Sequence, residues 1–253
     1  MNTEETCPEG PVLALEALSL VRRGRKILDD VDLNITGRGR VCGILGSNGA
    51  GKTSLLKVLT GLVRPSSGSV SVLGDTMPHG VMPADVGALV EEPRFYPWLS
   101  ARDNLMVAAG GRSDRTARVD EVLAAVGLQD RADDRVRIYS QGMRQRLGIG
   151  RVLLSEPEVV LLDEPANGLD PEGIAWLRTL LGSQRERGAT VVVTSHVLSE
   201  IQRTCDSVVV MSGGRIVAGG AMADVLAGSS SLEDLYFSLS DDSAPPVSHR
   251  WTV

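Results

Sequence analysis

Eight consecutive residues, 46–53, have the types and spacing that hold a polyphosphate. The run is Gly46-Ser47-Asn48-Gly49-Ala50-Gly51-Lys52-Thr53. It fits the pattern of a glycine, four residues of any type, and then Gly-Lys-Ser/Thr. Because glycine has no Cβ, such a backbone can curve closely around phosphates and point its N–H groups at them. Lys52 can then reach the terminal phosphates, and Thr53 can give its hydroxyl to Mg²⁺. We expect this run and the following Ser54 to contact a nucleoside triphosphate.

The segments on either side supply the context that the pattern requires. Residues 41–45 form a short apolar run typical of a buried strand, and residues 53–59 favour a helix that stops near Gly61. A helix that begins at the loop directs the positive end of its dipole at the same anion. The alternative is a glycine-rich turn with a surface lysine, but the flanking strand and helix favour a phosphate site.

Two acidic residues follow a second apolar run. Residues 159–162 (VVLL) are continuously apolar, as expected of a strand buried on both faces, and Asp163 and Glu164 come directly after them. The end of such a strand faces the ligand crevice of a doubly wound sheet. Asp163 suits the shell of a phosphate-bound Mg²⁺, and Glu164 could orient or deprotonate the attacking water. A solvated acidic strand end is the alternative, which the presence of a phosphate loop disfavours.

His196 and Ser140 each have a structural and a functional interpretation. His196 ends the run Thr194-Ser195-His196 after another apolar strand, so it should emerge at the same sheet edge as Asp163. It could contact the terminal phosphate or the water, although a single histidine at a strand end is more often structural. Ser140 opens a predicted helix, either as an ordinary N-cap or as part of a second anion-binding helix terminus. Position alone does not decide between these two roles of Ser140.

The order of the expected elements indicates an α/β protein with a helical insertion. Strands alternate with helices on either side of a helix-rich stretch, residues 100–155, which argues for a mainly parallel sheet. Residues 12–20 and 27–35 predict an N-terminal hairpin or meander. The other expected segments are strands 69–73, 86–90, 190–194, 207–211 and 215–218, and helices 100–109, 113 or 114 to 127, one from 140, 172–187, 197–204 and 229–240.

Composition narrows the class of protein. The 253 residues carry a formal net charge of −6, which gives no support for a basic nucleic-acid surface. No apolar run approaches the roughly 20 residues needed to span a bilayer, and the polar, acidic stretch 1–10 does not resemble a signal peptide. The three cysteines are scattered, so they indicate neither a disulfide framework nor a zinc site. We expect a cytoplasmic protein.

Together, these motifs resemble the ATPase family of ABC transporters. The resemblance runs from about Val12 to Leu239, and its most specific part is a signature helix just upstream of an Asp-Glu strand. Within this family, the chain looks most like single-domain drug, lantibiotic or ABC-2 type exporter subunits. The segments that resemble this branch are residues 95–98 (FYPW) and 140–154. The motifs are the phosphate loop, Tyr139-Ser140-Gln141-Gly142-Met143-Arg144-Gln145-Arg146, Leu162-Asp163-Glu164-Pro165, Gly168-Leu169-Asp170 and Ser195-His196.

The resemblance implies a fold and an activity. The fold class would be α/β: a P-loop NTPase core with a mainly parallel sheet, an N-terminal antiparallel β-subdomain and an inserted helical subdomain. The activity would be hydrolysis of ATP with Mg²⁺, and Lys52, Glu164 and His196 would be catalytic. The expected parts are a single ABC ATPase domain in 12–239 (core 12–92 and 156–220, helical subdomain about 93–155), a C-terminal helical extension in 221–240 and a flexible tail in 241–253.

The resemblance also implies partners. Two ATPase subunits, identical or related, would pair head to tail, so that Ser140 and Gly142 of one close on the ATP held by Lys52 of the other. The pair would power a separate membrane permease, with export of a drug, peptide or antibiotic as the expected task, and would lie on the inner face of the cell membrane through that permease. The alternative is a soluble, non-transport ABC ATPase acting on nucleic acid or ribosomes. Such relatives usually carry a long coiled-coil insertion or two cassettes in one chain, and this sequence has neither.

The sequence departs from the family pattern at functional positions. Glu91 stands where the family usually has a glutamine that touches Mg²⁺ or the lytic water, and we expect its carboxylate at the metal. Arg22 or Arg23 stands where an aromatic residue usually stacks on adenine, and a guanidinium can also stack on a flat ring. The variable positions of the signature are Tyr139, Gln141 and Met143.

Three aromatic residues gather in the FYPW segment. Phe95, Tyr96 and Trp98 are three of the eight aromatic side chains of the chain. One interpretation is packing at the base of the helical subdomain. The other is a groove that receives a cytoplasmic helix of a membrane subunit, because exposed aromatic residues favour interfaces.

Overall fold

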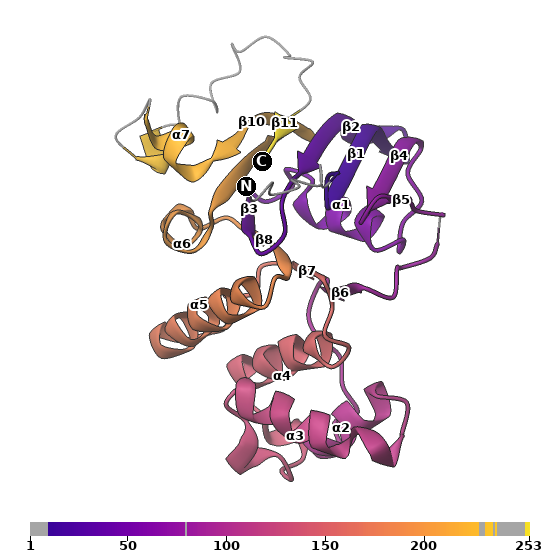
Figure 1. Cartoon of the computed structure of the whole chain (residues 1–253), viewed down its shortest axis with the longest axis vertical. Coiled ribbons are helices and arrows are strands. Elements are labelled where there is room, and N and C mark those ends of the chain that lie inside the picture. The colour runs from indigo at the N-terminus through magenta and orange to yellow at the C-terminus, as the bar shows by residue number, and fades with distance from the viewer. Residues whose placement is uncertain (1–9, 79, 228–230, 235, 237–250) are drawn as a thin grey trace, which may run out of the picture.

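The structure is a computed structural model that describes residues 10–78, 80–227, 231–234, 236 and 251–253 (Figure 1). Its centre is a six-stranded sheet with the order β10-β9-β3-β8-β7-β6. Neighbouring strands are parallel except β10, which pairs antiparallel with β9. The strands are β3 (Val41–Leu45), β6 (Val86–Leu89), β7 (Val159–Leu162), β8 (Thr190–Ser195), β9 (Ser207–Ser212) and β10 (Arg215–Ala221).

Successive residues of the central strands enter two different cores, so both faces of the sheet are covered. In β8, Val191 and Val193 belong to the core on the side of the helical lobe, whereas Val192 belongs to the core on the side of the second sheet. β3, β7 and β8 contain only buried residues, which explains their continuous apolar sequences. The α/β fold and the mainly parallel sheet predicted from the sequence are confirmed.

A second, five-stranded sheet has the order β11-β2-β1-β4-β5. β1 pairs antiparallel with both β2 and β4, and β4 pairs antiparallel with β5. The first strand pair is joined by the tight turn Arg23-Gly24, where both residues have positive φ (49° and 75°), as a two-residue hairpin requires. The strands are β1 (Leu13–Arg22), β2 (Arg25–Ile35), β4 (Ser67–Val72), β5 (Asp75–Thr76) and β11 (Trp251–Thr252).

Three helices form a lobe at one end of the molecule (Figure 1). These are α2 (Ala101–Ala108), α3 (Thr116–Ala125) and α4 (Gln141–Leu153), joined by short 3₁₀ turns. Serine side chains start two of them: Ser100 accepts the amide hydrogen of Asp103 at 3.0 Å, and Ser140 accepts that of Met143 at 3.2 Å. The other helices are α1 (Lys52–Leu59), α5 (Pro171–Glu186), α6 (Leu198–Thr204) and α7 (Met222–Ala227).

Trp176 of α5 holds the helical lobe against the rest of the molecule. Its Nε1–H donates to the carbonyl of Ala125 at 3.1 Å, and the guanidinium of Arg146 lies 4.6 Å from the centre of its ring. A second contact runs from the Gln145 amide to the carbonyl of Pro165, at 3.2 Å. The lobe is therefore joined to the central sheet through α5 and the loop after β7, and α4 also contacts β6 directly.

The end of the chain differs from the prediction. Residues 251–253 were expected within a loose tail, but β11 pairs parallel with β2 and Val253 is buried. Backbone hydrogen bonds to Asn34 and Thr36 hold it there, and a sequence pattern cannot show such a long-range pairing. The predicted helix 229–240 lies largely outside the described residues. Among the described residues, none of the helices is long and apolar enough to cross a bilayer.

Candidate functional site

The phosphate loop connects β3 to α1, as the sequence predicted. Gly51 is the N-cap of α1 with φ at 108°, and no side chain bonds to the cap, so the first-turn amides stay available to an anion. A Cβ on Gly46 would come within 2.6 Å of the carbonyl of Met211. The loop therefore needs glycine at both positions, one for its backbone conformation and one for its close approach to β9.

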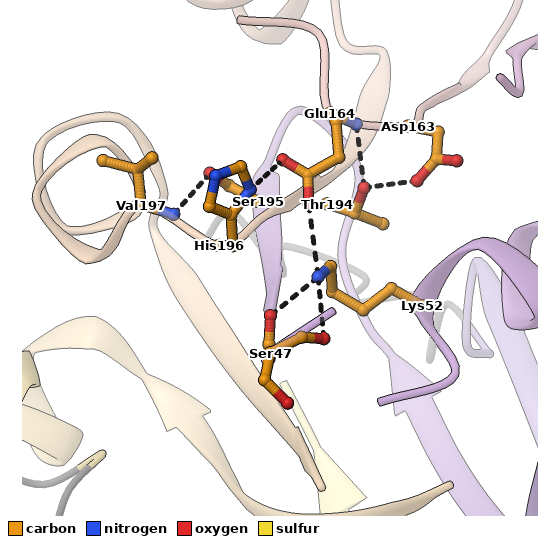
Figure 2. A network of polar contacts seen from close by, with 9 residues as sticks. Ser47, Lys52, Asp163, Glu164, Thr194, Ser195, His196 and Val197 are labelled. Atoms are coloured by element: carbon orange, nitrogen blue, oxygen red, sulfur yellow. Dashed lines mark hydrogen bonds and ion pairs between the residues drawn. The ribbon is translucent and has the colours of Figure 1, made fainter. Parts of the chain in front are cut away.

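Lys52 is buried and lies folded onto the loop (Figure 2). Its Nζ donates to the carbonyls of Gly46 at 2.7 Å and Ser47 at 3.3 Å. The same nitrogen lies 3.2 Å from Oε1 of Glu164. Lysine has three N–H donors, so these contacts can occupy them all, and the ammonium stands where it can exchange them for phosphate oxygens.

The strand ends predicted to share one sheet edge do so. β3, β8 and β7 are adjacent and parallel, and they end at Leu45, Ser195 and Leu162. Glu164 Oε2 lies 2.8 Å from Nδ1 of His196, while its other oxygen faces Lys52 (Figure 2). The glutamate is thus held between a cation and an imidazole.

Thr194 is a site residue to which the sequence analysis gave no role. Its hydroxyl donates to Asp163 Oδ1 at 2.7 Å and accepts the amide hydrogen of Glu164 at 2.9 Å. In the run Thr194-Ser195-His196, the sequence pattern predicts a chemical role for the histidine alone. Its position next to the predicted strand end was the available signal for Thr194, although β8 also contains hydroxyls at Thr190 and Ser195.

An open cleft of about 760 Å³ lies beside these carboxylates. Asp163, Glu164 and Glu91 all line it, but the Glu91 carboxylate contacts Lys57 of α1, with 2.5 Å between Oε1 and Nζ. That hydrogen bond lowers the pKa of Glu91. Its side chain is 63% exposed. The structure thus places Glu91 at the rim of the cleft, and its role as a metal ligand stays a prediction.

Ser140 and Gly142 line a different groove, of about 530 Å³, at the start of α4. Ser140 is the N-cap of that helix. A Cβ on Gly142 would lie 3.0 Å from the carbonyl of Gly168, so glycine permits the close contact between the signature helix and the loop after β7. In this single chain the groove adjoins the cleft beside Glu164, since Gln141 and Gly168 line both, but residues 46–54 line neither. Arg22 is exposed at the end of β1, and its contact with a base stays a prediction.

Comparison with known proteins shows the family of this chain. The family model for ABC transporters matches residues 28–167. The ABC transporter ATP-binding protein YhcH of Bacillus subtilis, itself uncharacterized, is 43% identical over 210 residues, which cover 81% of this chain and 68% of YhcH. This chain belongs to the ABC transporter ATP-binding family. It is therefore an ATPase of the ABC class.

Other members of the ABC family agree with this assignment. The bacitracin transport ATP-binding protein BcrA of Bacillus licheniformis is 41% identical over 198 residues, covering 76% of this chain and 64% of BcrA. A solved ATP-binding subunit of an ABC transporter superposes with a TM-score of 0.81 and 28% identity, covering 91% of this chain and all of the other. The protein cbiO1 of Clostridium perfringens, part of the ABC transporter complex cbiONQ, gives 0.78 and 30%, covering 87% and 92%. These relatives favour transport over the nucleic-acid alternative.

Proposed function

We propose that this ABC ATPase hydrolyses Mg-ATP to power a separate membrane permease that exports a drug, peptide or antibiotic. The observation that carries the hydrolytic part is the position of Glu164 between Lys52 and His196. The export part is supported by BcrA and by the lantibiotic transport protein SrtF of Streptococcus pyogenes. SrtF is 37% identical over 212 residues, which cover 84% of this chain and 90% of SrtF.

The proposed mechanism begins with the loop residues 46–54, whose backbone amides bind the phosphates of ATP. Lys52 leaves the carbonyls of Gly46 and Ser47 and its contact with Glu164, and binds the terminal phosphates. Release from Lys52 frees the Glu164 carboxylate to orient and deprotonate the attacking water. His196 keeps that carboxylate in place and adds a polar contact to the terminal phosphate. Positive groups arranged in advance around the developing charge lower the barrier.

Asp163 and Thr53 fit a magnesium ion. Both offer oxygen ligands, which Mg²⁺ prefers, and one oxygen of Asp163 points away from Thr194 (Figure 2). No group of three or more His, Cys, Asp or Glu residues in the described part of the chain could hold a metal ion. The remaining ligands would be phosphate oxygens, water and the predicted ligand Glu91. When bound, Mg²⁺ neutralises the charge that develops on the transferred phosphate.

The groove at Ser140 and Gly142 supports the head-to-tail dimer. It opens at the N-terminus of a 13-residue helix, where an anion is favoured. Because residues 46–54 line neither this groove nor the adjoining cleft, Ser140 and Gly142 would complete a nucleotide site on a second subunit. We therefore infer two ATP molecules at the interface between two subunits.

Part of the helical lobe is suited to the permease. Phe95 packs against the core, whereas Tyr96 and Trp98 are 49% and 64% exposed and their ring centres lie 5.7 Å apart. Ile138 is also exposed, close to this pair, because the amide of Arg137 donates to the carbonyl of Pro97 at 2.9 Å. Exposed aromatic pairs favour protein interfaces. We infer that they receive a helix of the permease and hold this chain at the membrane.

Substitution of the glutamate tests the hydrolytic proposal. Glu164→Gln should bind ATP, hydrolyse it at least 100-fold more slowly, and accumulate as a dimer with Mg-ATP, because hydrolysis no longer separates the subunits. Light scattering measures the dimer. Lys52→Ala should abolish ATP binding, and Glu186→Gln, at the exposed far end of α5, should behave as the unmodified protein. A Glu164→Gln protein that stays monomeric in saturating Mg-ATP contradicts the dimer.

A further inference from the structure

The hydroxyl of Thr194 contacts two acidic residues at the same time. Thr194 is fully buried near the end of β8, 31 residues from Asp163 along the chain. It donates its proton to Asp163 Oδ1 at 2.7 Å and accepts the amide hydrogen of Glu164 at 2.9 Å (Figure 2). A hydroxyl can donate one hydrogen bond and accept others, so both contacts are compatible.

The contact with Glu164 acts on an unfavourable backbone conformation. Glu164 has a backbone φ of +46°, a region that residues other than glycine rarely adopt. Such a conformation persists only where the surroundings hold it. The hydrogen bond from the Glu164 amide to Thr194 provides this restraint, and the conformation directs the glutamate side chain toward Lys52 and His196.

The contact with Asp163 fixes which carboxylate oxygen faces the cleft. Asp163 is buried, yet it also lines the open cleft. Because Oδ1 is bound by the hydroxyl, the other oxygen is left for a ligand in the cleft. Threonine suits this role, since its branched Cβ restricts rotation about χ1 in a strand.

We propose that Thr194 is a positioning residue for ATP hydrolysis, because one hydroxyl sets both the metal-facing oxygen of Asp163 and the backbone of Glu164. This inference rests on the proposed roles of these two acids. Serine keeps the hydroxyl, so it should largely replace threonine. Valine has nearly the same shape but cannot form either hydrogen bond.

Turnover and magnesium dependence test the proposal. Thr194→Val should lower kcat about 10- to 100-fold and raise the Mg²⁺ concentration for half-maximal turnover about tenfold, the usual effect of removing a residue that orients a metal ligand. In Thr194→Val, the KM for ATP at saturating Mg²⁺ should change less than about threefold, since residues 46–54 are untouched. Thr194→Ser should stay within about fivefold of the unmodified protein in kcat, KM and magnesium dependence. Thr190→Val is the matched control, because Thr190 is equally buried in β8 but donates to Gly37.

A second measurement needs neither ATP nor metal. Amide hydrogen exchange of the segment containing Glu164 should be about tenfold faster or more in Thr194→Val than in Thr190→Val, because the amide loses its acceptor. Unchanged exchange and unchanged magnesium dependence in folded Thr194→Val overturn the proposal. If the valine variant does not fold, Thr194→Ser decides, since a serine variant that loses turnover overturns the role of the hydroxyl. Failure of the proposed hydrolysis is distinguishable, because Glu164→Gln would then hydrolyse ATP normally while the exchange difference remained.

Discussion

The carboxylate of Glu91 lies against Lys57 of α1, at the position where the family resemblance leads one to expect a glutamine. Lys57 follows Thr53 by four residues on this helix, so the two side chains share a face with their Cβ atoms roughly 6 Å apart. Glu91 therefore lies about one helical turn from the hydroxyl proposed to bind Mg²⁺. The hydrogen bond from Lys57 lowers the pKa of Glu91, and a glutamate is ionised at neutral pH even without such a shift.

A charge-removal series at this pair should change how ATP binding depends on Mg²⁺. Lys57→Met removes the neighbouring cation, so the negative charge of Glu91 repels ATP unless the metal is present. The ratio of ATP affinity with Mg²⁺ to ATP affinity without it should be about two- to fivefold larger in Lys57→Met than in the unmodified protein. The ratio should be smallest in Glu91→Gln. These effects are modest because the ion pair is exposed. ATP titrations across a Mg²⁺ series measure it.

The double variant is the control for this series. Lys57→Met with Glu91→Gln should match Glu91→Gln alone, and high ionic strength should reduce the differences among the variants, because salt screens exposed charges. Identical magnesium dependence in all four proteins would mean that Glu91 is an ordinary solvated hinge residue.

At the scale of elements, β11 supports the outer edge of β2. The amide of Val253 donates to the carbonyl of Asn34 at 2.9 Å, and its carbonyl accepts the amide hydrogen of Thr36 at 2.7 Å. A Cβ on Gly219 of β10 would lie 3.6 Å from both Trp251 and Val253. The short strand thus pairs part of an otherwise open edge and lies beside the last strand of the central sheet.

Truncation of Val253 tests this element. Val253→Ala removes two buried methyl groups and should lower the free energy of unfolding by about 1–2 kcal/mol, which lowers the Tm by roughly 2–8 °C for a chain of this size. Thr252→Ala, at an exposed neighbouring position, should change the Tm by less than about 2 °C. Calorimetry measures both, and equal effects of the two substitutions would argue against the docked strand.

At the scale of the whole molecule, the helical lobe carries both the signature groove and the exposed aromatic pair, and Trp176 joins it to α5. A permease helix bound at Tyr96 and Trp98 would therefore contact the same lobe that presents Ser140 to a second subunit. This arrangement gives a physical route by which ATP-driven pairing can move a membrane partner.

Removal of one exposed ring tests that route. Trp98→Ala should weaken the complex with the proposed membrane permease at least tenfold, as expected when a central aromatic residue of an interface is truncated. ATP binding and the Tm of the isolated chain should stay unchanged, because Trp98 is 64% exposed. Trp176→Ala is the contrasting control, since loss of its contacts with Ala125 and Arg146 should lower the Tm. A Trp98→Ala chain that melts early but binds the membrane protein normally would assign Trp98 to packing.

The sequence by itself determined the features that depend on neighbouring residues. The phosphate loop is a run of eight residues whose conformation follows from its own glycines, and the apolar strands with their polar ends predicted where Asp163, Glu164 and His196 would meet. Parallel strands end at one edge whatever their register, so these convergent positions could be expected without knowing any contact.

Only the tertiary structure decided which atoms touch. Thr194 meets Asp163 from 31 residues away, Glu91 meets Lys57 from 34, and Thr36 meets Val253 from 217. The FYPW segment shows the same limit, because its composition did not reveal that Phe95 is partly buried whereas Trp98 is exposed. Pairings of this kind depend on strand register and on what packs above each side chain, and those are properties of the whole chain rather than of any local pattern.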